Sequence, residues 1–112
     1  MSPTKSTNRR VVVTGIGAIT SIGFGKNQFW ESLKAGKSGV SKIEAFDTTD
    51  FTTHFAGEIK NFDPSQYIHP KRLKRMDRTS QLAVACAKMA IEDANVDPKC
   101  NGPDRTGVII GT

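Results

Sequence analysis

The sequence predicts an α/β fold in which a mixed or parallel sheet is covered by helices. Two short apolar runs, residues 11–14 and 107–111, are rich in β-branched side chains and show no polar alternation. Such runs are typical of strands that are buried on both faces of a sheet with parallel neighbours. A long alanine-rich segment with helical periodicity, residues 76–95, lies between them. A strand, a helix and a second strand in this order indicate an α/β domain.

The composition is that of one globular domain. The chain has 112 residues, and 37% of them are apolar before its 10 glycines are counted, which excludes disorder throughout. We expect residues 1–8 to be a disordered tail and residues 9–112 to be folded. No run of about 18 apolar residues occurs, and no signal-peptide core follows the polar N-terminus. We therefore expect a soluble cytoplasmic protein with no membrane contact.

The first third of the chain contains a strand, a loop and a helix. The run at residues 11–14 ends at Gly15 and Gly17, which begin a glycine-rich loop. In residues 27–35 the large apolar side chains share one helical face, and Gly36 stands where glycine commonly ends a helix. Residues 27–35 are therefore expected to be helical.

The middle of the chain is expected to be an ordered excursion with short strands. Residues 37–62 carry single apolar residues among Ser, Thr, Asp and Gly, and the best strand within them is residues 55–59. Residues 63–66, Asp-Pro-Ser-Gln, predict a helical turn, because proline at the first helical position loses no donor that the helix needs.

The longest regular segment, residues 76–95, predicts a helix that Asp77 or Arg78 opens. Its many small side chains would let another element approach closely. Because its charges are confined to its ends, we expect it to be buried along most of its length. Turn residues at 97–103 then break the chain before the last apolar run, residues 107–111.

Two glycine motifs resemble nucleotide-binding loops but fail in detail. Gly15 and Gly17 follow a strand as in the dinucleotide motif, but Thr20 stands at the third glycine position. Gly25 and Lys26 match the end of a phosphate-binding loop, but the Ser or Thr that should follow is missing. We therefore interpret the first motif as a tight turn that leaves a central strand, and we expect no cofactor.

The cysteines and histidines are weak candidates for catalysis or metal binding. Cys86 lies in the middle of the long helix on an apolar face, where cysteine is usually a small core residue, and Cys100 lies in a polar turn. His54 and His69 have no cysteine or carboxylate at a metal-ligand spacing. We expect none of the four to be a nucleophile or a metal ligand, and two cysteines without a paired spacing fit a reducing compartment.

The formal net charge of +5 is concentrated in one basic run, residues 71–78. On a helical turn Lys71, Lys74 and Arg75 are spaced i, i+3 and i+4 and share a face, which makes a compact cationic site for an acidic helix or a phosphate. Cations near a helix N-terminus oppose the helix dipole at a cost of about 0.3–1 kcal/mol each, so stability does not explain them. We interpret them as a partner-binding site; a solvated helix start is the alternative.

Six blocks of sequence occur in a familiar order and spacing: residues 9–17, 30–39, 46–47, 55–57, 74–78 and 107–111. Taken together they resemble the start of a β-ketoacyl-acyl carrier protein synthase of the elongating type II kind. The resemblance implies the N-terminal part of a thiolase-like fold, with a mixed sheet and covering helices. Residues 9–112 would then be the first segment of its N-terminal half.

The resemblance also implies the function, a 3-oxoacyl-acyl carrier protein synthase of fatty acid synthesis. Family members form an acyl thioester on a cysteine at the N-terminus of a buried helix. They then condense it with a malonyl unit after decarboxylation, with the help of two histidines. None of the four cysteines and histidines of this chain matches these residues, so the catalytic residues are expected beyond residue 112.

The family resemblance further implies partners. Basic residues that precede the long helix have counterparts that help to dock the acidic acyl carrier protein, which assigns this role to Lys71, Lys74 and Arg75. Family members are homodimers, and the resemblance implies no metal and no other cofactor.

Length and charge leave two alternatives. A complete family enzyme is several times longer, so we expect this chain to be an inactive N-terminal fragment with unpaired strand edges. One alternative is a non-catalytic subunit that docks the carrier protein or acts like a chain-length factor. The other is a basic module that binds nucleic acid. Only Tyr67 lies near the basic run to stack on a base, which argues against this last class.

Overall fold

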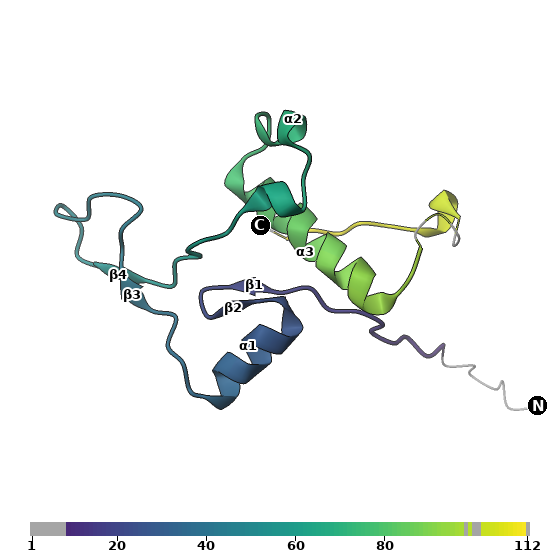
Figure 1. The fold of residues 1–112 in the computed structure, drawn as a ribbon, viewed down its shortest axis with the longest axis horizontal. Helices are drawn as coiled ribbons and strands as arrows, with labels where there is room; N and C mark the ends of the chain where they lie inside the picture. The colour runs from purple at the N-terminus through teal and green to yellow at the C-terminus, as the bar shows by residue number, and fades with distance from the viewer. Residues whose placement is uncertain (1–8, 98, 100–101, 112) are drawn as a thin grey trace, which may run out of the picture.

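The computed structural model describes residues 9–97, 99 and 102–111, so the tail expected at residues 1–8 lies outside the described residues (Figure 1). Short strands and helices follow one another in the order β1 Ile19–Thr20, β2 Gly23–Phe24, α1 Gly25–Lys34, β3 Ser41–Lys42, β4 Phe55–Ala56, η1 Pro64–Gln66, α2 Pro70–Leu73, α3 Arg78–Ala94 and η2 Pro103–Arg105. The radius of gyration is 19.2 Å. A compact domain of this length has a radius of gyration of about 13 Å, so this chain is extended.

The sheets are two separate antiparallel hairpins. β1 pairs with β2, with Ile19 opposite Phe24, and β3 pairs with β4, with Ser41 opposite Ala56. The strand predicted at residues 55–59 forms only in its first two residues. In Figure 1 the β3–β4 hairpin lies at one end of the described chain, away from α3.

The two apolar runs do not form the buried strands predicted from the sequence. Residues 11–14 and 107–111 have no ladder partner among the described residues. Val11 is 93% exposed and Ile109 is 100% exposed. The backbone N–H and C=O groups of a strand must pair with those of a neighbouring strand. An apolar sequence does not replace that neighbour. The prediction of central strands is therefore wrong for this chain.

Helix α1 forms where a helix was predicted but begins two residues earlier. The Gln28 side chain accepts a hydrogen bond from the Phe24 N–H at 2.7 Å, and the Gly25 N–H donates to the Ala18 carbonyl at 2.7 Å. These contacts satisfy donors at the start of the helix that would otherwise have no partner. At the other end Gly36 has a φ of 64°, which confirms its predicted role after the helix.

The predicted turn and long helix are confirmed, with local caps. Asp63 accepts a hydrogen bond from the Ser65 N–H at 2.9 Å, and Asp77 caps α3 by accepting from the Ser80 N–H at 3.0 Å. Asn95 ends α3 in the left-handed region at φ 51°. Burial differs from the expectation: within the described part of α3 only Ala85 is fully buried. The other residues of α3 are half-buried or exposed.

Gly15 and Gly17 let the chain pass directly over α3. A Cβ atom on Gly15 would lie 2.1 Å from the Ala90 carbonyl oxygen, and one on Gly17 would lie 2.0 Å from the Cys86 carbonyl oxygen. This confirms that the small residues of α3 allow close approach. Neither glycine is among those with positive φ. The interpretation as a tight turn is therefore wrong, because both positions require glycine for helix contact.

No helix in the described ranges has both the length and the hydropathy that a membrane crossing needs. Among the described residues the buried apolar side chains are Phe62 and Ile68, which flank η1, and Ala85 of α3, the helix that η1 contacts. This small core lies next to residues 71–78, where most of the net positive charge is found.

Candidate functional site

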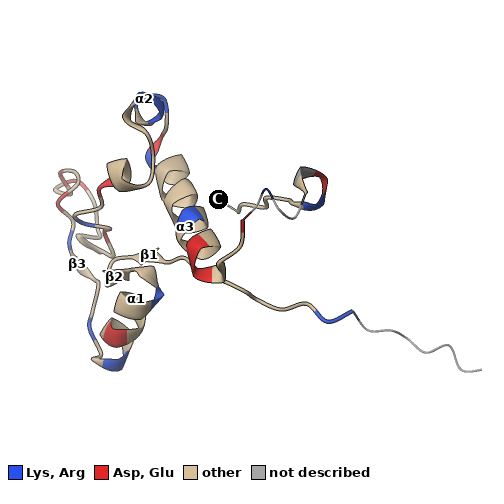
Figure 2. Cartoon of the chain, turned by 45° about the vertical axis from the view of Figure 1, so that its right-hand side comes forward, with Lys and Arg blue, Asp and Glu red and all other residues tan. Residues whose placement is uncertain are grey.

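Four cationic side chains gather on α2 and the turn that follows it, a region that we call the basic segment (residues 70–75). Lys71 and Arg72 lie within α2, Lys74 caps its C-terminus, and Arg75 follows. The Arg75 N–H donates to the Arg72 carbonyl at 3.0 Å, so the helical winding continues through Arg75. All four side chains are exposed, and Figure 2 shows this blue region at the tip of the molecule. The structure therefore places the three predicted residues together on one turn.

No carboxylate in the part of the chain that the structure describes forms an ion pair with the basic segment. Among the described residues, the cations that form ion pairs are Lys26, Lys34 and Lys60, and none lies in the basic segment. The nearest carboxylate in sequence, Asp77, is occupied as the cap of α3. Hydrogen bonds from the Ser80 hydroxyl and N–H hold the pKa of Asp77 below its ordinary value. The basic segment can therefore offer its charge to an external acidic partner.

Arg72 also belongs to this site, although it was not among the residues predicted from the sequence. The i, i+3, i+4 pattern that joins Lys71, Lys74 and Arg75 starts at Lys71 and does not include Arg72. Arg72 is nevertheless exposed on the same four-residue helix. The signal that could have found it is its position three residues before Arg75, since residues three apart are neighbours on a helix surface.

The start of α2 is fixed by local chemistry. Pro70 occupies the first helical position, and the His69 ring nitrogen Nδ1 accepts a hydrogen bond from the Lys71 N–H at 3.3 Å. His69 therefore acts as a helix cap here. The residue before it, Ile68, is only 4% exposed and fastens the start of α2 to the small core.

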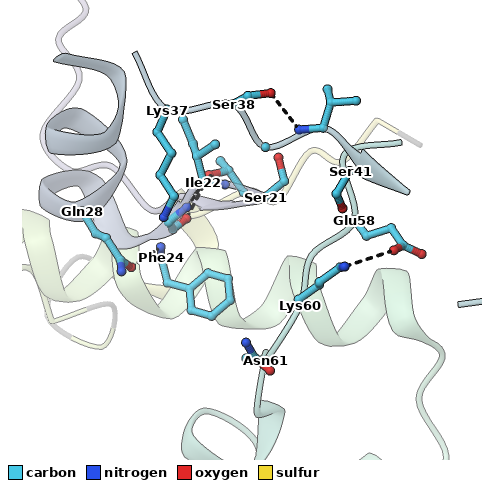
Figure 3. A pocket seen from close by; sticks show the side chains of 14 residues that line it. Ser21, Ile22, Phe24, Gln28, Lys37, Ser38, Ser41, Glu58, Lys60 and Asn61 are labelled. Atoms are coloured by element: carbon cyan, nitrogen blue, oxygen red, sulfur yellow. Dashed lines mark hydrogen bonds and ion pairs between the residues drawn. The ribbon is translucent and has the colours of Figure 1, made fainter. Parts of the chain in front are cut away.

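A polar pocket of about 470 Å³ lies between the β1–β2 turn, the loop after α1 and residues 58–61 (Figure 3). Its hydroxyl groups come from Thr20, Ser21, Ser38 and Ser41. Lys60 lies 2.9 Å from Glu44 and 4.0 Å from Glu58. Backbone N–H groups of Glu44 and Ala45 hold the pKa of Glu58 below its ordinary value. No cysteine or histidine is among the described residues that line the pocket, so it lacks a nucleophile with a base.

The remaining candidates have structural surroundings. Cys86 is half-buried on α3, and this burial raises the pKa of its thiol, which disfavours the thiolate that a nucleophile needs. The His54 Nδ1 lies 3.0 Å from the hydroxyl of the buried Thr48. Cys100 lies outside the described residues. Within the described ranges no three His, Cys, Asp or Glu side chains gather as a metal site requires.

Known proteins that resemble this chain are named as condensing enzymes. The 3-oxoacyl-[acyl-carrier-protein] synthase 2 of Staphylococcus aureus (strain N315) is 43% identical over 107 residues, which cover 96% of this chain and 26% of the relative. The protein of the same name from Vibrio cholerae is 42% identical over 104 residues, 93% of this chain and 25% of its own length. The chain therefore spans about a quarter of the length of these relatives.

A solved structure and a family profile agree with these relatives. A chain of the ishigamide ketosynthase/chain length factor superposes with a TM-score of 0.74 and 44% identity, over 81% of this chain and 23% of that one. The profile described as "Beta-ketoacyl synthase, N-terminal domain" matches residues 8–112. The predicted resemblance and fold class are thus confirmed: the chain belongs to the β-ketoacyl synthase family and forms the N-terminal part of its thiolase-like fold.

Proposed function

We propose that the full-length protein is a 3-oxoacyl-[acyl-carrier-protein] synthase of fatty acid synthesis, and that this chain supplies scaffold and a docking surface for the acyl carrier protein. The names of the relatives support the reaction class. The observation that carries the docking role is the set of exposed, unneutralised cations Lys71, Lys74 and Arg75 on one helical turn. An acidic carrier protein would be attracted to this surface and oriented by it.

The proposed reaction has two steps. An acyl group moves from a carrier thioester to a cysteine thiol of the enzyme, and the carrier thiol leaves. A malonyl-carrier then loses carbon dioxide, and the electron pair that remains attacks the acyl thioester. The 3-oxoacyl-carrier forms and the cysteine thiol is restored. The cysteine and two histidines that perform these steps are proposed to lie in the remainder of the protein.

The full-length protein is proposed to be a homodimer in the cytoplasm. The family resemblance supports a homodimer that is soluble and cytoplasmic, binds neither nucleic acid nor membrane, and uses no cofactor. The carrier protein would meet the basic segment transiently, because each cycle requires it to deliver a malonyl unit and leave. Exposed charge pairs suit such an encounter, since they accelerate association more than they strengthen the complex.

A non-catalytic chain-length-factor-like subunit is the second candidate function. The observation that favours it is the similarity to a chain of the ishigamide ketosynthase/chain length factor, at 44% identity and a TM-score of 0.74. A subunit of this kind would keep the fold and the basic segment, but condensation would take place in its partner.

Turnover by the purified full-length protein distinguishes a synthase from a non-catalytic subunit. The protein is supplied with acyl-carrier and malonyl-carrier, and carbon dioxide release and 3-oxoacyl-carrier formation are measured. Product from the protein alone supports the synthase. Product only after a catalytic partner synthase is added supports the second candidate. No product in either case would contradict both.

A further inference from the structure

Arg78 belongs to the basic run in the sequence, and it is exposed, but its guanidinium group contacts an earlier segment of the chain. Its guanidinium carbon lies 5.1 Å from the centre of the Phe62 ring, over the ring face. Its Nη2 also donates a hydrogen bond to the Ile59 carbonyl at 3.2 Å. Arg78 therefore contacts the segment that enters η1, nineteen residues earlier along the chain.

The Phe62 ring is in contact with the side chains of Phe24, Tyr67 and Arg78. It is 9% exposed, and the Phe24 ring meets it edge to face with centroids 6.0 Å apart. The Tyr67 ring, at the other end of η1, stacks on the Phe62 ring with the two centroids 6.2 Å apart. The Tyr67 carbonyl in turn accepts a hydrogen bond from the Lys88 ammonium of α3. The segment that leads into α2 is thus fastened to α3 at two points, Arg78 and Lys88.

The position of Arg78 needs an explanation other than helix stability. It is the first residue of α3, where a cation opposes the helix dipole. The planar guanidinium group can lie over a ring and donate a hydrogen bond in its own plane at the same time. A lysine ammonium cannot maintain this paired geometry. The two contacts made by Arg78 use that property.

We propose that Arg78 is a positioning residue for carrier-protein docking: it holds residues 59–67 against α3, so that the basic segment is presented in a preformed orientation. This inference rests on the proposed docking function. A preformed surface loses less conformational freedom when its partner binds than a mobile one does. Arg78 therefore acts through Phe62 and Ile59, and the contact with the carrier is made by the basic segment.

The test replaces Arg78 with lysine in the full-length protein, which retains the charge and removes the stacked geometry. Arg105→Lys is the matched control, because Arg105 is exposed in η2, outside the basic segment and its support. Amide hydrogen exchange of residues 59–75 and the KM and kcat for malonyl-carrier are measured for both. We expect Arg78→Lys to accelerate exchange in this segment and to raise KM several-fold with little change in kcat. Arg105→Lys should leave both readouts unchanged.

The two readouts separate the failure of this inference from that of the docking function. Unchanged exchange in Arg78→Lys would overturn the positioning role. Faster exchange with unchanged KM would also overturn it, provided that charge reversal in the basic segment raises KM. If charge reversal in the basic segment and Arg78→Lys both leave KM unchanged, the docking function itself is contradicted. Should Arg78→Lys not fold, Lys88→Met removes the second fastening point, and the same pair of results is expected from it.

Discussion

Lys26 at the start of α1 forms an ion pair with Asp93 near the end of α3. The same carboxylate accepts a hydrogen bond from the Ile16 N–H at 3.0 Å. The hydrogen bond from Lys26, followed by that from Ile16, holds the pKa of Asp93 below its ordinary value of 3.8. One carboxylate therefore joins two helices and the glycine-containing segment that passes over α3.

Replacing Asp93 with asparagine should lower stability at neutral pH. Because the folded pKa lies below the unfolded one, the charged carboxylate stabilises the fold at pH values above about 3.8, and this contribution is lost as the pH falls through the folded pKa. Denaturation midpoints of the wild type and Asp93→Asn in the full-length protein should differ from pH 7 to pH 5 and converge in more acidic solution. A difference that stays constant to the lowest pH would contradict the role of the ionised pair. Lys26→Met should give a matching pattern.

Gly17→Ala should destabilise the protein through a steric clash with α3. The added methyl group would lie 2.0 Å from the Cys86 carbonyl oxygen, and a helix backbone cannot move aside without losing its own hydrogen bonds. Overpacking of this kind costs about 1–3 kcal/mol. The control is Gly57→Ala, whose methyl group would lie 3.3 Å from the movable Ser21 hydroxyl and no nearer than 3.9 Å to the backbone oxygen of Gly39, an ordinary contact distance. Chemical denaturation measures both, and equal effects would refute the contact.

Truncation of Ile68 should have a graded effect, because this side chain is 4% exposed beneath the basic segment. Ile68→Val should cost about 0.5–1.5 kcal/mol and Ile68→Ala about 2–5 kcal/mol, since the second leaves a larger cavity. Urea unfolding of the full-length variants gives both values. A loss below about 0.5 kcal/mol for Ile68→Ala would mean that the core beneath α2 is not packed as described.

Cys86 should react slowly with alkylating agents. Burial on α3 raises the pKa of its thiol, so less of the reactive thiolate exists at neutral pH. Iodoacetamide labelling of the native full-length protein, followed by peptide mass mapping, should modify Cys86 far more slowly than in denaturant. Rapid labelling of the native protein would contradict its assignment as a small packing residue.

The helices were predictable because their signals are local. Asp77 and Asn95 cap α3 from positions next to its ends, and Gly36 follows α1 in the conformation that its residue type favours. The β-branched runs at residues 11–14 and 107–111 were not predictable in the same way. A strand requires a partner distant in sequence, and the described residues provide none for either run.

The candidate site was predictable as a charge pattern but not as a surface. Helical spacing placed Lys71, Lys74 and Arg75 together, and the structure keeps them on one turn. Spacing could not separate Arg78 from them, because the contact that occupies its guanidinium group is made with the Phe62 ring, sixteen positions earlier in the sequence. Contacts across the fold, and not residue type, decide which cations remain available to a partner.

Charge reversal in the basic segment tests the central claim, that these cations dock the carrier protein. Lys71→Glu, Lys74→Glu and Arg75→Glu are combined in the full-length protein, and KM for malonyl-carrier is measured at low and at high salt. We expect KM at low salt to rise about tenfold or more, which corresponds to the loss of at least 1.4 kcal/mol of interaction. The wild-type KM should rise with salt, because salt screens exposed charges, and the variant should respond less. The same KM for both proteins at low salt would contradict the docking function.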